Sequence, residues 1–136
     1  MIRNQFIEKL FNMQQKKIQK TVENGRIYIT ATFNNTLVTV TDEKGNPLVT
    51  GSCGMYGFSG TRKSTPHAAT ITTEATLRKA TDEYGFRTAD IYVKGIGPGR
   101  EAALRSIKSS SVDINRIIDI TPVPHNGVRP PKIRRV

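Results

Sequence analysis

The sequence predicts a single α/β domain, built in three layers around a mixed five-stranded sheet. Two observations lead to this class. Segments with apolar residues at every second position, as in strands, alternate with segments in which apolar residues recur at helical spacing. The chain has 136 residues, which is enough for one domain of roughly 100 residues with a modest core and an extension at each end.

The first three expected strands follow one another directly. Apolar residues alternate with polar ones over 27–33, ending on an inward Phe33, and this period of two predicts a half-buried strand. Asn34 and Asn35 are expected to form a two-residue turn, because asparagine tolerates the positive φ of tight hairpins. An antiparallel meander is then completed by strands at 37–41 and 47–53.

A threonine-rich helix is expected next. Thr65 should cap its start, with Pro66 in the first turn and Gly85 as the left-handed residue after its end. Because β-branched residues are poor helix formers, packing on the sheet must stabilise it. The expected buried stripe consists of Ala69, Thr73, Thr76, Leu77, Ala80 and Tyr84.

Two more strands, at 88–94 and 112–120, should enclose a second helix at 100–110. Isoleucines occupy both faces of the last segment, which is typical of a buried central strand. The resulting order, β-β-β-α-β-α-β, predicts a ribonuclease-H-like architecture. In it the strands that follow helices join in parallel through right-handed crossovers.

The composition favours a polyanionic partner. Lys and Arg number 21 against 11 acidic residues, so the net charge is +10, and a small basic domain normally directs such charge at phosphates. No apolar run approaches the length of a membrane span. The single cysteine excludes an internal disulfide and is compatible with a reducing compartment.

Both ends are predicted to be basic extensions of the domain at 25–120. Residues 1–24 are interpreted as an appended helix or a loose arm. The tail at 121–136 holds four of the seven prolines and four cations but no carboxylate, so it can be neither helix nor central strand. We expect a stiff cationic arm that binds nucleic acid, although a merely solvated end has the same composition.

The segment 94–101 joins a strand to a helix and contains three glycines. Helix N-termini offer free amides and partial positive charge, so we expect an anion site there. Arg100 is unfavourable beside the helix dipole unless an anion compensates it, and Arg105 follows on the helix. The spacing matches neither a P-loop nor a dinucleotide fingerprint, and a tight turn without a ligand remains the alternative.

A second glycine-rich loop, 57–65, places Arg62 and Lys63 just before a helix. Tyr56 or Phe58 beside it could stack on an unpaired base, but anchoring of the Phe58 ring on the core is the stronger interpretation. An enzyme is not expected, because neither histidine has a reactive partner and the carboxylates do not converge on a metal pair. No cofactor or metal site is expected.

Four ordered motifs resemble the bacterial and organellar type of the small-subunit ribosomal protein eleven family. They are FNNTLVTVTDEKGN at 33–46, GFSGTRKSTPHAA at 57–69, VKGIGPGREAALRSI at 93–107 and DITPVPHNGVRPPKIRRV at 119–136. The chain departs from the family pattern at Val128, at His67 and in its threonine-rich helix. These departures bear on local contacts and not on the assignment.

The resemblance implies a structural constituent of the small subunit. It would bind ribosomal RNA on the platform near the messenger exit path, beside neighbouring platform proteins, in a bacterial cytoplasm, mitochondrion or plastid. Alternatives from other classes are a free single-stranded nucleic-acid binder and a ribonuclease-H-like enzyme. The expected RNA contacts are Asn34, Asn35, Arg62, Lys63, Gly97, Gly99, Arg100, Arg105, His125, Asn126, Arg129, Lys132, Arg134 and Arg135.

Overall fold

The computed structural model describes residues 5, 7–8 and 21–135. Apart from residues 5, 7 and 8, the helix or loose arm expected over 1–20 lies outside this part of the chain. The strands and α-helices follow the predicted order: β1 (Asn24–Ala31), β2 (Thr36–Asp42), β3 (Pro47–Ser52), α2 (Pro66–Tyr84), β4 (Thr88–Lys94), α3 (Gly99–Ser109) and β5 (Asp113–Asp119). Two short 3-10 helices, η1 (Cys53–Tyr56) and η2 (Gly60–Ser64), lie between β3 and α2, where a glycine-rich loop was predicted.

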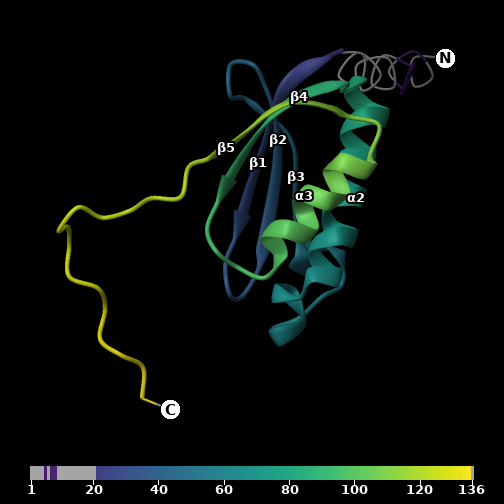
Figure 1. The fold of residues 1–136 in the computed structure, drawn as a ribbon. Coiled ribbons are helices and arrows are strands. Elements are labelled where there is room, and N and C mark those ends of the chain that lie inside the picture. Colours follow the sequence, from purple (N-terminus) through teal and green to yellow (C-terminus); the bar gives the residue numbers. More distant parts are fainter. Residues whose placement is uncertain (1–4, 6, 9–20, 136) are drawn as a thin grey trace.

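The five strands form one mixed sheet in the order β3-β2-β1-β4-β5. The meander β1-β2-β3 is antiparallel, as predicted. The strands that follow the helices join in parallel, β4 beside β1 and β5 beside β4. The predicted α/β class and mixed sheet are therefore confirmed (Figure 1).

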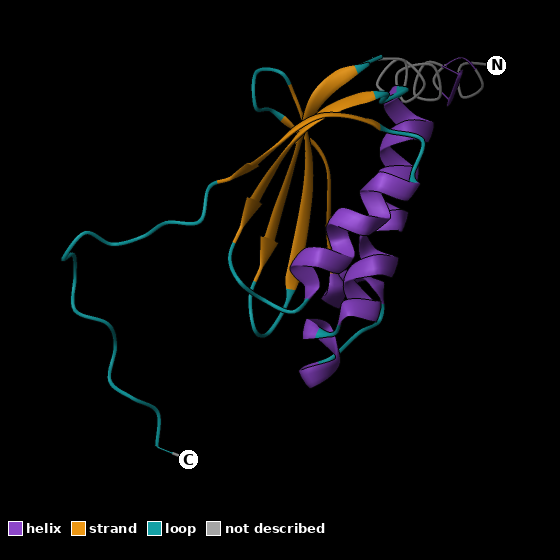
Figure 2. Ribbon diagram, in the orientation of Figure 1, coloured by secondary structure: helices purple, strands orange, loops and turns teal. Residues whose placement is uncertain are grey.

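The expected three layers are wrong for the described residues, because both helices lie on the same face of the sheet (Figure 2). α2 packs against β2 and β3, while α3 packs against β1 and α2. The strands are accordingly one-sided: Ile27 and Ile29 are fully buried toward the helices, whereas Tyr28 between them is only half-buried. A strand that buries one face supplies apolar surface for one helical layer only.

β5 is an edge strand and not the buried central strand that its isoleucines predicted. Ile117 is 55% exposed and Ile120 is 40% exposed. The register shows why the pattern misled: Ala89 pairs with Ile114 and Asp90 with Arg116, so Asn115 is an extra residue. Such a bulge reverses the alternation, so Ile114 and Ile117 lie on one face, opposite Ala89 and Ile91, while Ile118 lies on the other face opposite Tyr92.

The first hairpin differs from the expected Asn34-Asn35 turn by one residue. Ala31 pairs with Thr36 and the Thr32 amide donates to the Asn35 carbonyl at 2.9 Å, so Phe33 and Asn34 form the tip. Among described non-glycine residues only Asn126 has positive φ. The Thr32 hydroxyl stabilises the turn instead, accepting from the amides of Asn34 and Asn35. Phe33, expected inward, is 69% exposed.

The threonines of α2 are accommodated by bonding back to the helix. The hydroxyls of Thr73 and Thr76 donate to the carbonyls four residues earlier at 2.7 and 2.8 Å, which satisfies buried polar groups. The predicted caps are confirmed, since Thr65 accepts from the Ala68 amide and Gly85 has φ 65°. The predicted stripe is buried, with Tyr84 packed partly buried against the core.

We expect Gly51→Ala to destabilise the domain, because a Cβ there would meet the Thr76 hydroxyl of α2. Overpacking of this kind costs about 1–3 kcal/mol in free energy of unfolding. Urea unfolding of the single and double variants measures this cost, and Thr76→Ala is the second variant because it removes the hydroxyl that the new Cβ would meet. The double variant should be less destabilised than the sum of the single variants, and simple additivity would contradict the predicted contact.

Candidate nucleic-acid interface

One end of the domain, here the hairpin end, brings together the β1–β2 turn at 32–35, the β4–α3 loop at 95–98 and the first residues of α2 and α3 (Figure 1). The Gly97 amide donates to the Ala31 carbonyl at 3.2 Å, which joins loop to hairpin. Gly99 packs against the side chains of Thr36 and Ala69, which places the start of α3 beside the start of α2. Two helix N-termini therefore open at this end.

Several predicted RNA contacts meet at the hairpin end. Asn34 is exposed at the tip, whereas the Asn35 side chain is half-buried and accepts from the Thr36 amide at 2.8 Å. Arg62 is exposed and Lys63 half-buried on η2, immediately before α2. Arg105, farther along α3, has an 82% exposed side chain and lies 3.8 Å from Glu101 in a surface ion pair.

The glycines of the β4–α3 loop are packed against the protein itself. Gly97 and Gly99 are buried, and a Cβ at these positions would meet the Thr32 backbone and the Thr36 side chain. The Gly97 amide donates to the Ala31 carbonyl and is therefore not free for a phosphate. Close packing on the hairpin therefore explains these two glycines without a ligand.

The start of α3 is tied to the end of β5 by a cluster that we call the tail latch, formed by Gly95, Arg100, Asp119 and Thr121. Arg100 donates through Nη1 to the Gly95 carbonyl at 2.9 Å and through Nη2 to Asp119 Oδ2 at 3.0 Å. The Thr121 hydroxyl donates to Asp119 Oδ1 at 2.6 Å and accepts from the Gly95 amide at 3.1 Å. The latch fixes the point from which the tail departs.

The carboxylate of the tail latch is strongly stabilised in its charged form. Hydrogen bonds from the Thr121 hydroxyl, from the Thr121 amide and from Arg100 lower the pKa of Asp119 from 3.8 to about 2. Asp119 also supplies the anion that the position of Arg100 at a helix N-terminus demands. Asp119 therefore compensates the charge of Arg100 within the protein itself. A phosphate partner for Arg100 stays a prediction.

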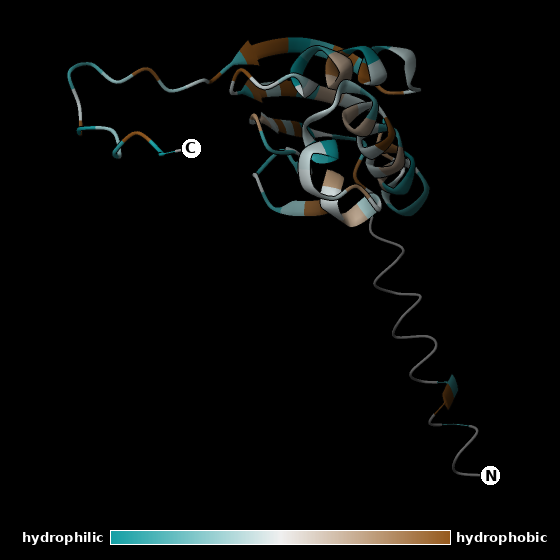
Figure 3. Cartoon of the chain, turned by 90° about the horizontal axis from the view of Figure 1, so that it is seen from below, coloured by the Kyte–Doolittle hydropathy of each residue, from teal (hydrophilic) through white to brown (hydrophobic). Residues whose placement is uncertain are grey.

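The tail beyond the latch extends away from the domain (Figures 1 and 3). Every described residue from 122 to 135 is exposed, and none of its cations forms an ion pair with a described residue. The His125 to Gly127 segment bends at Asn126, whose φ is 60°. The exposed cations and polar groups available to a partner are His125, Asn126, Arg129, Lys132, Arg134 and Arg135.

The described residues contain no group of three or more His, Cys, Asp or Glu side chains able to hold a metal ion. A groove of about 430 Å³ between α2 and α3 is lined by Glu74, Arg78 and Asp82 together with serines. The hydroxyls of Ser106, Ser109 and Ser110 in it donate to helix carbonyls. No described helix has the length and apolarity that a membrane crossing requires.

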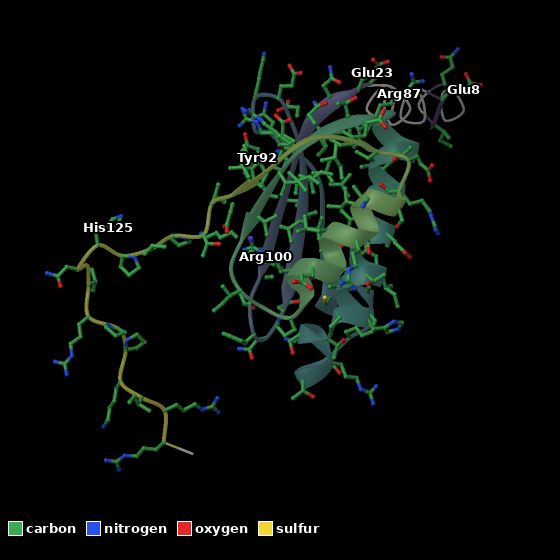
Figure 4. The ribbon with its side chains drawn as sticks, in the orientation of Figure 1. Glu8, Glu23, Arg87, Tyr92, Arg100 and His125 are labelled. Carbon is green, nitrogen blue, oxygen red and sulfur yellow. The ribbon has the colours of Figure 1, made fainter. Side chains whose placement is uncertain are left out.

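Two kinds of exposed side chain escaped the sequence interpretation. Phe33 and Ile96, 69% and 72% exposed, project from the two loops of the hairpin end. Tyr28 and Tyr92 form a stacked pair, and Tyr92 lies on the side of the sheet away from the helices (Figure 4). Each tyrosine occupies an outward position of an alternating strand, but only the parallel register of β1 and β4 makes them neighbours.

We expect Asp119→Asn to lower the melting temperature at neutral pH. A carboxyl with a depressed folded-state pKa stabilises the fold above its unfolded value of 3.8, and the contribution is lost as the pH falls through about 2. The difference in melting temperature between the variant and the unchanged chain should therefore shrink as the pH falls from about 4 to about 2. Asp113→Asn, on the exposed start of β5, is the control. A deficit that is independent of pH would rule out the carboxylate as its source.

Comparison with known protein families gives a match to the family model described as ribosomal protein S11, over residues 25–135. The match includes the hairpin end, the tail latch and the described tail. The family implies a small-subunit ribosomal protein that binds ribosomal RNA and serves translation in a structural, non-enzymatic role. The chain therefore belongs to the ribosomal protein S11 family.

Proposed function

We propose that this chain is a structural constituent of the platform of the small ribosomal subunit, near the messenger exit path, where it supports subunit assembly. Its partners there are small-subunit ribosomal RNA and neighbouring platform proteins, with messenger RNA nearby. The compartment is a bacterial cytoplasm or an organelle, mitochondrion or plastid. The observation that carries the proposal is that the tail latch holds the base of a cationic tail at the start of α3, which lies beside the start of α2.

The tail concentrates positive charge, with four cations and no carboxylate over residues 121–136. Its exposed cations form no ion pair with a described residue, and a proline-rich chain loses little conformational freedom when it is ordered along an RNA groove. Phosphate contacts position a protein on RNA without reading its sequence. Within the proposal, Arg129, Lys132, Arg134 and Arg135 have this role.

The hairpin end supplies the contacts that orient the domain. Helix N-termini attract phosphate through free amides and the helix dipole, and Arg62 and Lys63 stand at the N-terminal side of α2. Asn34 presents its amide at the exposed hairpin tip. Gly97, Gly99 and Asn35 belong to the proposed interface as its framework, since packing or the turn already occupies them. Arg100 contributes chiefly by holding the base of the tail.

Sedimentation tests the assignment. In an extract fractionated at moderate salt, the tagged full-length chain should travel with small subunits. Recovery from the soluble fraction alone would overturn the proposal and favour a nucleic-acid binder that acts outside the ribosome. Cross-linking within isolated subunits then tests the finer placement, which predicts links to platform RNA and to messenger RNA.

We expect Arg134→Ala combined with Arg135→Ala to reduce the salt dependence of RNA binding. Each phosphate contact contributes roughly 0.7–0.9 to the slope of log affinity against log salt concentration, so the slope should fall by about one to two. Filter binding across a salt series measures it. The matched control removes the same charge from the exposed face of α2, at Arg78 and Lys79. Equal slopes for the unchanged chain and the tail variant would show that the tail tip does not contact phosphate.

A further inference from the structure

The face of the sheet that the helices leave uncovered, here the open face, carries polar, aromatic and cationic side chains. The register of β1 and β4 places three pairs on it: Arg26 opposite Asp90, Tyr28 opposite Tyr92, and Thr30 opposite Lys94. Thr39 and Thr50 extend the row of Tyr28 onto β2 and β3. All of these side chains are half-buried or exposed, and Figure 4 shows Tyr92 on the side away from the helices.

The centre of the open face is a preorganised aromatic stack. The rings of Tyr28 and Tyr92 lie with centroids 5.0 Å apart and planes inclined by 15°. The Arg26 guanidinium lies 5.6 Å from the centroid of Tyr92 and donates to the Tyr28 hydroxyl at 3.4 Å. Both rings therefore have neighbours that hold their orientation while they remain half-exposed. A flat ring that is already fixed loses little freedom when another ring stacks on it.

The charges around this stack favour an anion. Three cations, Arg26, Lys94 and Arg116, stand against two carboxylates, Asp90, which is bound to Arg116 at 3.4 Å, and Glu43, which lines the same hollow as Arg26. Threonine hydroxyls between the cations are suitable partners for ribose and phosphate oxygens. The aliphatic residues Leu37 and Ile118 flank this centre at register positions beside Thr30 and Tyr92. Tyrosine and arginine are also frequent in protein interfaces, but lysine is depleted there, so Lys94 beside the stack favours RNA.

We propose that the open face is a second RNA-binding surface, on which an unpaired base of ribosomal RNA continues the Tyr28–Tyr92 stack while Arg26 and Lys94 contact the adjoining phosphates. Aromatic rings and guanidinium planes bind splayed bases in single-stranded RNA in this manner. The inference rests on the proposed ribosomal function. It goes beyond that proposal because this surface lies outside the tail and the hairpin end.

A fluorescent reporter tests the stacking directly. The chain contains no tryptophan, so Tyr92→Trp introduces a single emitter on the open face. Titration with a transcript of the small-subunit ribosomal RNA should quench its emission, because a stacked base lies against the indole. Tyr84→Trp, at a position packed against the core, is the control and should change little. Quenching of both probes alike would argue against a base on the open face.

Affinity gives a second readout. Tyr28→Thr with Tyr92→Thr keeps residues that suit strands but removes the stack, and should weaken RNA binding about tenfold or more. The salt slope should stay unchanged, since no phosphate contact is lost. Tyr28→Phe with Tyr92→Phe keeps the rings and should retain nearly all the affinity. If the threonine variant fails to fold, Arg26→Gln on the open face is compared with Arg78→Gln on α2, and only the former should weaken binding.

The outcomes separate this inference from the proposed function. Normal RNA affinity of the threonine variant, with no quenching at position 92, would refute the open-face site and leave the ribosomal assignment intact. Failure of the unchanged chain to bind the RNA would overturn both. Quenching by neighbouring ribosomal proteins in the absence of RNA would show that the open face is a protein interface and would also refute the inference.

Discussion

Burial of one face of the sheet is the constraint from which the rest of this structure follows. The core residues of β1, β2 and β4 all point toward α2 and α3. Buried and partly exposed side chains therefore alternate along β1 and β4, and along β2 as far as the irregularity after Val40. Because apolar surface is available on one side only, both helices lie there. The opposite face is thereby left to polar and aromatic residues, and β5 is left with exposed isoleucines at the edge.

Close packing at the hairpin end is the second constraint on the structure, and it explains why glycines occur in the β4–α3 loop. With no Cβ, Gly95 and Gly97 lie against the carbonyls of Ala31 and Thr32, and Gly99 lies against Thr36. Gly95 also has φ 96°, which a residue with a side chain rarely adopts. The loop is therefore held by the hairpin, and Arg100 at the start of α3 is brought to Asp119. Local chain geometry thus determines where the tail begins.

The same arrangement divides functional surface from framework. The exposed cations of η2 and of the tail are available for phosphate, whereas Arg100 is already bound to a carboxylate and a carbonyl. A cation in a motif therefore has one of two roles in this chain: it is available to bind phosphate, or it holds another part of the protein. Its partners in the folded protein, and not its position beside a glycine-rich loop, decide between these roles. Free cations add to long-range attraction, while the paired one orients the segment that carries them.

The sequence alone determined the order of the elements, the caps of α2 and the basic, proline-rich nature of the tail, because these depend on local backbone preferences and on composition. Its motifs also indicated the family that residues 25–135 match. The tertiary structure decided the number of layers, the edge position of β5 and the bulge at Asn115. It also decided the pairing of Arg100 with Asp119 and of Tyr28 with Tyr92. These features join residues far apart in the chain. Periodicity records which side of a strand is apolar, but which strand lies beside it is set only when the sheet assembles.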